Sequence, residues 1–232
     1  MKKFRIFLGI LGLLILLGGG AGGVWYVYDS LNFFTTENAQ ITADMITITP
    51  EITGKLKSWD VREGDMVTAG QVLGKQDLDM LVTNTAMNVQ NLTNSADSIL
   101  ARAEIKSPIA GKVIQSTVIK GQVISPGMEI AIIADTAHFY VKAHVEETDI
   151  FKIAPGQPVD IRIDAYPRRH FIGAVESIAQ ATESAFNTFP SLNTSGTFSK
   201  VTQLIPVKIT LVDAGDLLLM PGMNVTVKIH IR

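Results

Sequence analysis

The sequence predicts a mainly β protein with two separate β units and one N-terminal transmembrane helix. Three observations support this fold class: an uncharged run near the N-terminus, an internal repeat of strand-like segments punctuated by glycine, and a series of alternating strands in the C-terminal half. The first β unit is expected to be a sandwich and the second a small antiparallel barrel.

The N-terminal segment has the features of a membrane anchor. Residues 1–5 carry three basic side chains, and residues 6–28 contain no charged one. A helix of that length spans a hydrocarbon core of about 30 Å. The segment ends in Trp25, Tyr26 and Tyr28, aromatic residues that are typical of the membrane interface. The basic flank predicts a cytoplasmic tail and an extracytoplasmic location for the rest of the chain.

The alternative for this segment is a secretory signal peptide that is removed. Its apolar region would be shorter, roughly 7–15 residues, and would be followed by small residues at a cleavage site. Ala21-Gly22-Gly23 is small enough to be cut. The sequence therefore favours a single-span anchor while leaving cleavage open.

The composition excludes several classes of function. A chain of 232 residues allows one or two domains, and a net charge of −2 provides no basic excess to bind the phosphates of a nucleic acid. The chain contains no cysteine, so it has no disulfide framework, no thiolate metal site and no lipid-anchoring cysteine.

Two segments of the chain repeat the same pattern. Residues 50–73 and 107–130 superpose when shifted by 57 positions (107 − 50), and six glycines then fall in register. Glycine marks backbone positions that need a positive φ or a close approach. Each copy is too small to bury its own apolar face, so we expect the two to pack as one sandwich. The glycine pairs are Gly54 with Gly111, Gly64 with Gly121, and Gly70 with Gly127.

The segments around the repeats complete the first β unit. Residues 30–37 are expected to be a tether, and residues 39–49 have the partial alternation and β-branched bias of a strand that leads into the first repeat. Residues 77–103 predict a short antiparallel helical hairpin, because the apolar residues of its second half follow helical spacing and residues 91–95 favour a turn. Each helix would have about 11 residues and a length of about 16 Å.

From Ala137 onward, five strand-like runs indicate a small antiparallel barrel. Short alternating segments are separated by turns that contain glycine or proline. Residues 146–153 are expected to form a short helix whose acidic first residues favour the helix dipole. The strand-like runs are Phe139–Val145, Val159–Ala165, Phe171–Gln180, Leu204–Leu211 and Asn224–Ile231.

These patterns resemble those of the HlyD-type membrane fusion proteins, the periplasmic adaptor subunits of export and efflux pumps. The second repeat begins like the family's second half-motif, from Ala103 to Gly111. The barrel half resembles the EmrA-like multidrug branch in VKAHVEETDI, IAPGQPVDIRIDAYP, GTFSKVTQLIPVKI and LMPGM. The first repeat matches the family's split biotinyl/lipoyl-like half-motif at Gly54, Val61, Gly64, Asp65, Val67, Gly70, Gln71 and Leu73.

The patterns and the resemblance together predict five parts. These are a cytoplasmic tail (1–5), a transmembrane helix (6–28), a lipoyl-like domain (38–76 with 104–136), a short helical hairpin (77–103) and a β-barrel domain (137–232). In the resembled family the hairpin contacts an outer-membrane channel and is usually much longer. A hairpin this short is equally consistent with a plug for the end of the sandwich, so both roles stay open.

The sequence contains no pattern of a catalytic, cofactor or metal site. The G-x-S-x-G, P-loop and H-E-x-x-H patterns are absent. His138 and His144 would lie on one face of a predicted strand, but zinc uses three or four ligands. Lys75 is nearest the lysine that is modified in lipoyl and biotinyl carriers, yet about 27 residues follow before the second repeat, too many for a carrier's tight hairpin. We therefore predict no enzyme activity, no cofactor and no metal.

Two stretches of the barrel half are candidates for partner contacts. Arg168 and Arg169 lie in a predicted turn, where each basic residue favours anionic lipid headgroups by about 1 kcal/mol; a transporter contact and a solvated turn are the alternatives. The polar loop 182–199 contains Phe186 and Phe189, which are costly to expose, so we expect them to pack against the barrel or a partner.

The predicted function is that of a membrane-anchored adaptor in an efflux pump. The helix would hold the chain in the inner (cytoplasmic) membrane beside a transporter, with the bulk of the chain periplasmic, while several copies associate into a ring or collar. The EmrA-like resemblance implies a multidrug transporter of the major facilitator type, and the family implies an outer-membrane channel as a further partner. Two alternatives stay open: a lipoyl or biotinyl carrier domain, and an envelope scaffold that works without a pump.

Overall fold

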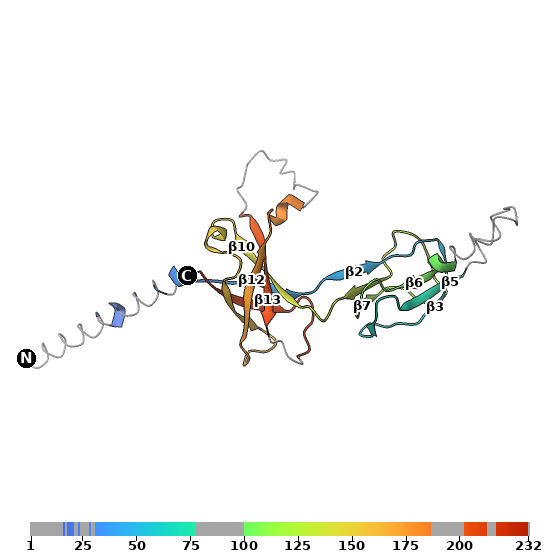
Figure 1. Ribbon diagram of the computed structural model, residues 1–232, viewed down its shortest axis with the longest axis horizontal. Helices are drawn as coiled ribbons and strands as arrows, with labels where there is room; N and C mark the ends of the chain where they lie inside the picture. Colours follow the sequence, from blue (N-terminus) through green and yellow to red (C-terminus); the bar gives the residue numbers. More distant parts are fainter. Residues whose placement is uncertain are drawn as a thin grey trace, which may run out of the picture. The chain divides into compact units, whose positions relative to one another are not determined.

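The computed structural model describes residues 31–77, 100–186, 202–212 and 217–231, together with a few isolated positions before residue 31. It divides into two compact units: Ala43–Phe139 forms one, and the other combines the chain up to Thr42 with Tyr140–Arg232 (Figure 1). The predicted span, residues 6–28, lies outside the described residues except for isolated positions. Within the described part, no helix has both the length and the apolar character needed to cross a membrane.

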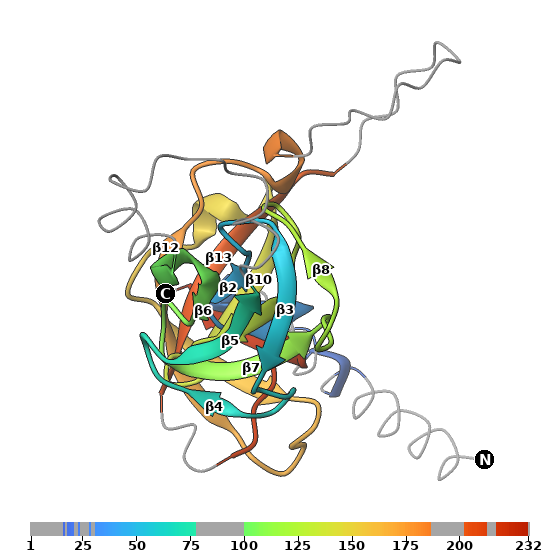
Figure 2. The same ribbon diagram turned by 90° about the vertical axis from the view of Figure 1, so that its right-hand side faces the viewer.

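The first unit is a sandwich of two four-stranded antiparallel sheets. One sheet has the strand order β2-β9-β7-β4 and the other the order β6-β5-β3-β8. Figure 2 shows β6, β5 and β3 side by side. The strands are β2 (Met45–Ile48), β3 (Gly54–Trp59), β4 (Met66–Val67), β5 (Val72–Asp77), β6 (Glu104–Lys106), β7 (Gly111–Ser116), β8 (Val123–Ile124) and β9 (Ala131–Ala134).

The 57-residue repeat relates the two sheets to each other. β3 pairs with β8 in one sheet as β7 pairs with β4 in the other, so each sheet takes strands from both repeats. The backbone N–H of Gly64 donates to the carbonyl oxygen of Val113 at 2.8 Å. The counterpart bond, from Gly121 to Leu56, has the same length. The two repeats are therefore interleaved and form one folding unit.

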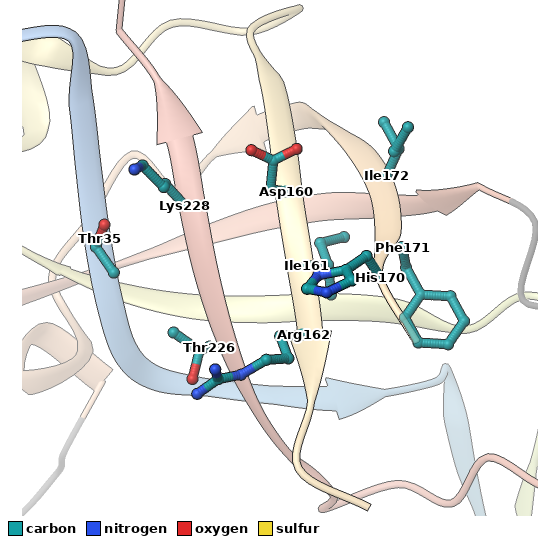
Figure 3. Close-up of a pocket in the computed structure, with 9 residues that line it drawn as sticks. All are labelled: Thr35, Asp160, Ile161, Arg162, His170, Phe171, Ile172, Thr226 and Lys228. Carbon is teal, nitrogen blue, oxygen red and sulfur yellow. The ribbon is translucent and has the colours of Figure 1, made fainter. Parts of the chain in front are cut away.

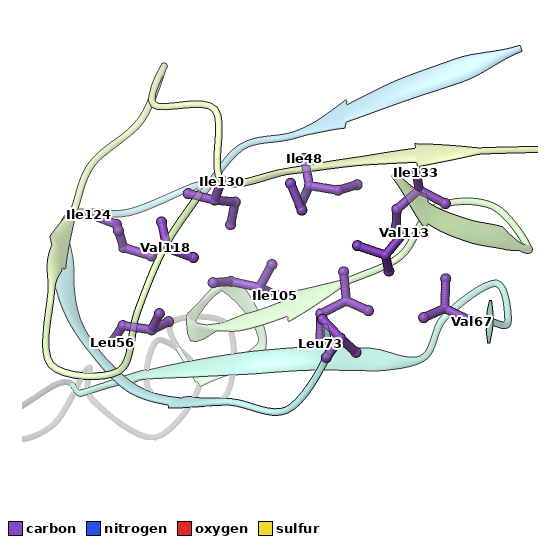
Figure 4. Close-up of a cluster of buried hydrophobic side chains, with 12 residues drawn as sticks. Ile48, Leu56, Val67, Leu73, Ile105, Val113, Val118, Ile124, Ile130 and Ile133 are labelled. Atoms are coloured by element: carbon purple, nitrogen blue, oxygen red, sulfur yellow. The ribbon is translucent and has the colours of Figure 1, made fainter. Parts of the chain in front are cut away.

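The core between these sheets consists mainly of equivalent residues. Ala131 and Ile133, just after the second repeat, add to it, whereas Gly74 and Gln76 stand at the positions 57 residues earlier. The two repeats share one apolar core, as the sequence predicted. Five pairs of buried side chains, each pair 57 positions apart, make up the rest of the core (Figure 4): Ile48 and Ile105, Leu56 and Val113, Val61 and Val118, Val67 and Ile124, and Leu73 and Ile130.

The second unit is a closed antiparallel barrel, with the strand order β1-β10-β13-β12-β11-β14. Side chains alternate between the barrel interior and its surface: Val141, Ala143 and Val145 of β10 are fully buried, while the residues between them are partly exposed. The predicted barrel is confirmed. Its strands are β1 (Phe33–Thr42), β10 (Tyr140–Glu146), β11 (Pro158–Ile163), β12 (Phe171–Ile178), β13 (Leu204–Val212) and β14 (Asn224–His230).

The barrel contains one strand that the sequence did not predict. We expected a tether over residues 30–37 and one sandwich strand over residues 39–49, and both expectations are wrong. β1 occupies Phe33–Thr42 and pairs with β10 and β14 in the barrel, while β2 begins only at Met45. The unit boundaries therefore lie at Ala43 and Tyr140 instead of residues 38 and 137.

The irregular pairing of β1 explains this error. The register of β1 against β14 shifts between Thr36 and Ala39, and such a bulge interrupts the alternation of buried and exposed side chains. Beyond the bulge, Ala39 and Ile41 are buried in the barrel. A strand with a bulge near its middle has no clear period of two along its whole length, so the alternation test fails on it.

Two smaller expectations also need correction or lie outside the structure. The helix expected over residues 146–153 is a single 3-10 turn, η2 (Ile150–Lys152), because β10 extends to Glu146 and the backbone is extended again at Ile153. Of the predicted hairpin 77–103, residues 78–99 lie outside the described residues, and residues 100–103 are helical.

The barrel has two rims with different connections. β1 starts and β14 ends at one rim, which we call the first-strand rim; it also carries η2 between β10 and β11, and η3 (Glu183–Phe186) between β12 and β13. β1 ends and β10 starts at the opposite rim, which we call the linker rim, and the β11–β12 turn lies there. Contacts with different partners can therefore form at the two ends.

Candidate interaction surfaces

The six repeat glycines occupy two kinds of backbone position. Four of them have positive φ: Gly64 at +93°, Gly121 at +92°, Gly70 at +80° and Gly127 at +87°. Gly111 is required by close packing instead, because a Cβ atom there would lie 2.2 Å from the carbonyl oxygen of Ala134 across the β7–β9 pair. The equivalent Gly54 is less crowded, with its nearest atom, the Asp77 carbonyl oxygen, at 3.2 Å. These glycines shape the sandwich and offer no ligand group.

Lys75 does not have the surroundings of a carrier lysine. It lies within β5 and stands opposite Glu104 of β6, with 2.8 Å between Nζ and Oε1. The hydrogen bond from Lys75 holds the pKa of Glu104 below its usual range and raises that of Lys75 itself. A lysine in the middle of a paired strand, held by a carboxylate, lacks the exposed tip that a swinging prosthetic group needs.

Three of the four histidines, His138, His144 and His230, pair with carboxylates, each at a different place. His138 lies before β10 and not on it, so the expectation that His138 and His144 share a strand is wrong. Its Nδ1 is 2.7 Å from Asp135 Oδ2, and this hydrogen bond holds the pKa of Asp135 below its usual value. In the part of the chain that the structure describes, no three histidine or acidic side chains are placed to hold a metal ion.

The turn at the linker rim carries the predicted basic residues. Arg168, Arg169 and the adjoining His170 are exposed, and the hydroxyl of Tyr166 fixes the turn by donating to the carbonyl oxygen of Leu218 at 2.9 Å. Beside them the exposed side chains of two register partners, Ile172 and Val212, add apolar surface. The turn is therefore a rigid, basic and partly apolar feature of the surface.

A shallow hollow of about 500 Å³ begins at this turn and extends over the outside of β11, β14 and β1 (Figure 3). Asp160 and Lys228 line it from neighbouring strands, and Arg162 and His170 line it nearer the turn. Asp160 Oδ2 is 2.8 Å from His230 Nε2. The Lys228 ammonium lies 4.0 Å from the centre of the Phe33 ring. Charges of both signs in an open hollow suit a polar protein contact better than a small ligand.

The first-strand rim is fixed by a cluster of charged side chains on β10 and η3. Glu183 Oε1 accepts from Lys142 Nζ at 3.2 Å and lies 2.8 Å from His144 Nε2. Burial alone would raise the pKa of Glu183, but the hydrogen bond from Lys142 and the nearby His144 outweigh it and hold the pKa below its usual value. The cluster ties η3, and with it the start of the polar loop, to the barrel wall.

The structure separates the residues that were predicted to contact partners. Arg168 and Arg169 lie at the linker rim, whereas Phe186 ends η3 at the first-strand rim. Phe189 lies outside the described residues. The sequence analysis missed Phe151, which η2 exposes at the first-strand rim. The signal was present: Ile150 and Ile153 are three positions apart, so a single turn that buries both must turn Phe151 outward.

Two family models match the chain, one for each unit. Residues 44–136 match "RND MFP, barrel-sandwich hybrid domain", and residues 139–229 match "YknX-like beta-barrel domain". The matched ranges follow the division into sandwich and barrel, except that β1 precedes both of them.

Two relatives differ in how much of their length the chain covers. The chain is 36% identical over 230 residues to YhbJ of Bacillus subtilis, whose name describes an efflux system component; the match covers 99% of this chain and 94% of YhbJ. It is also 36% identical over 134 residues to the colistin resistance protein EmrA of Acinetobacter baumannii, covering 57% of this chain and 38% of that protein. The chain therefore spans YhbJ almost completely but less than half of the EmrA relative.

The fold resembles that of a solved structure. A chimera of MacA that contains the α-hairpin domain of Pseudomonas aeruginosa MexA superposes with a TM-score of 0.68 at 19% identity, covering 87% of this chain and 82% of the chimera. At this identity the likeness concerns the fold alone.

Proposed function

The chain belongs to the HlyD-type family of membrane fusion proteins, in its EmrA-like branch, and we propose that it is the membrane-anchored adaptor subunit of a multidrug efflux pump. The observation that carries this proposal is the match to YhbJ along nearly the whole of both chains. The family model that matches the sandwich describes a domain of such adaptors, and neither matched model describes a catalytic fold.

The proposed location is the inner (cytoplasmic) membrane, with one span and the N-terminus inside. The uncharged run of residues 6–28 and the basic residues before it support this orientation. The sandwich and barrel would then lie outside the cytoplasmic membrane, where the family's adaptors work. The open hollow on the barrel and the ion pairs Lys75–Glu104 and His144–Glu183 on the surface are consistent with a protein whose work is to contact other proteins.

The proposed partners follow from the same family membership. An inner-membrane transporter, of the major facilitator type in the EmrA-like branch, would supply the energy and the substrate path. Several copies of the chain would surround it as a ring or collar, through heterologous contacts that close by rotation. A contact to an outer-membrane channel would have to be made by residues 77–103, which are few for that reach.

Affinity purification of the full chain from its native membranes tests this function. A tagged chain extracted in mild detergent is expected to bring down one polytopic transporter, identified by mass spectrometry, in a fixed ratio to the adaptor. A tagged single-span protein of unrelated sequence serves as the control. Purification of the chain with no transporter would favour a pump-independent envelope scaffold.

The carrier alternative has its own test on the same sample. Its intact mass is expected to equal that of the unmodified chain. A mass increase that maps to Lys75 and corresponds to a lipoyl or biotinyl group would instead establish a carrier domain.

A further inference from the structure

The first-strand rim exposes the most accessible of the large apolar side chains in the described residues. Phe151 is 91% exposed. It is held outward by its neighbours, because Ile150 and Ile153 are buried on either side of it. A side chain that is fixed in this position cannot fold back onto the barrel to hide from water. Figure 1 shows the yellow turn of η2 and the orange η3 on the same side of the barrel.

The chain enters the barrel at this same rim. Tyr28, Leu31 and Asn32 are helical, and the Asn32 side chain donates to the carbonyl oxygen of Tyr28 at 2.7 Å. Asn32 is also bonded to the residue that follows β14, because the backbone N–H of Ile231 donates to the carbonyl oxygen of Asn32 at 2.9 Å. Leu31 and Tyr28 are more than half exposed, at 55% and 61%. Two segments far apart in the sequence therefore expose apolar side chains at one end of the barrel.

The sequence limits how far this rim can lie from a bilayer. The predicted span ends at Tyr28, and β1 starts at Phe33. At 1.5 Å per residue, a helix continued from Tyr28 to Asn32 advances only about 6 Å. The rim would thus lie within about one helical turn of the membrane interface, the layer in which aromatic side chains are enriched.

We propose that Phe151 and Leu31 contact the lipids of the outer leaflet, so that the barrel is held to the membrane at a second point beside its anchor helix. This inference rests on the anchor in the proposed function. One helix alone would leave the barrel free to tilt about its junction. A second contact from the β10–β11 connection restricts that tilt and so fixes the orientation in which the barrel meets a transporter.

The charges at the rim favour shallow contact with zwitterionic lipid. Asp149 beside η2 is paired with Lys152, with 2.6 Å between Oδ1 and Nζ. The exposed carboxylates Glu146 and Glu147 come just before this pair and repel a strongly anionic surface. Phosphatidylcholine vesicles are therefore the appropriate membrane, and Phe151 is expected at the depth of the headgroups and first methylenes.

Spin labels on single cysteines measure this depth directly, because the natural chain has no cysteine to remove. Phe151→Cys carries the label at the first-strand rim, and Ile172→Cys carries it at the linker rim, where Ile172 is 64% exposed. The full chain is reconstituted into phosphatidylcholine vesicles. Collision rates of each label with oxygen, which partitions into lipid, and with a water-soluble nickel complex are then compared by power-saturation EPR.

The expected result is a ratio of oxygen to nickel collisions several-fold higher at position 151 than at position 172. Equal ratios at the two positions would overturn the proposal. A label at 151 that is shielded from both reagents would overturn it too, and would indicate a protein contact in place of lipid. Flotation of the vesicles tests the anchor separately. A chain that does not float with the vesicles would refute the anchor and this inference together. A chain that floats but carries a water-exposed label at position 151 would refute this inference alone.

Discussion

Gly64 and Gly121 lie in equivalent turns of the sandwich at φ values of +93° and +92°. Their surroundings are also equivalent: the nearest atom to an added Cβ would be Lys112 Cε at 4.0 Å in one case and Lys55 Cε at 3.9 Å in the other. There is room for a methyl group at both positions, so only the backbone conformation opposes a side chain. The two repeats are therefore also equivalent in the backbone conformation that favours glycine at these positions.

Replacing either glycine by alanine is expected to lower the free energy of unfolding by about 1–2 kcal/mol, because an L-residue is penalised at positive φ. The two losses are expected to be similar, and Asn at the same positions is expected to cost less, since Asn tolerates this conformation better. Denaturant unfolding of the full chain in detergent measures all four variants. Alanine variants as stable as the wild type would contradict this account of the turns.

The Trp59 side chain reports where the two repeats meet. Its indole Nε1 donates to Ser116 Oγ at 2.8 Å, and the two residues are counterparts, 57 positions apart. A direct contact between equivalent residues places them at the pseudo-two-fold axis of the sandwich. The internal repeat aligns Trp59 with Ser116, but the sequence alone does not show that their side chains are in contact.

At the scale of elements, the core that the two repeats share is the feature that the sequence predicts best, whereas the pairing of β3 with β8 and of β4 with β7 across the repeats was not predicted. Three glycine pairs in register required two similar units, and a shared core followed because neither unit could bury its apolar face alone. β1 was assigned to the wrong unit because its bulge interrupts the alternation between Thr36 and Ala39. The positions of Arg168 and Phe186 at opposite rims depend on strand order, which no local pattern encodes.

Designed disulfides test the pairing of β4 with β7 and of β3 with β8. Met66 stands opposite Lys112, and Val123 stands opposite Lys55. Opposite residues of antiparallel strands have the spacing that a disulfide requires. Met66→Cys with Lys112→Cys, and Val123→Cys with Lys55→Cys, are each expected to form an intramolecular bond under mild oxidation, detected as a faster-migrating band on a non-reducing gel.

The exchanged combinations are the matched controls, because they use the same four positions. Met66→Cys with Lys55→Cys, and Val123→Cys with Lys112→Cys, place the two cysteines in different sheets. Neither is expected to cross-link within the chain. Equal cross-linking of all four combinations would contradict the interleaved sandwich.

The Glu183 cluster makes the attachment of η3 dependent on pH. The pKa of Glu183 is lower in the folded chain than its usual value of 4.5, so the stability that the cluster contributes is present above pH 4.5 and is lost as the pH falls through the lowered pKa. The side chain is 42% exposed, which limits the contribution to about 1 kcal/mol or less.

Glu183→Gln is therefore expected to destabilise the chain slightly at pH 6 and not at pH 3. The other carboxylates titrate in both proteins, so their effect on stability cancels when the variant and the wild type are compared at the same pH. The unfolding free energies at both values provide the measurement. A difference that is the same at pH 6 and pH 3 would show that the charge of Glu183 is not what holds η3.

At the scale of the whole molecule, the sandwich is inserted into the barrel along the chain. The barrel is interrupted after β1 by the entire sandwich and resumes at β10. Two chain crossings, at residues 42–43 and 139–140, therefore join the units. The sequence predicted the two units and their family, while the partner and the transported compound depend on surfaces of other molecules.

The most direct test of the adaptor function is the drug susceptibility of cells that lack the protein. A deletion strain is compared with the same strain carrying the full chain, across antimicrobial compounds of varied charge and size. The account predicts that the inhibitory concentration of at least one compound falls several-fold on deletion and is restored by the full chain. Unchanged susceptibility to every compound, together with unchanged efflux rates, would contradict it.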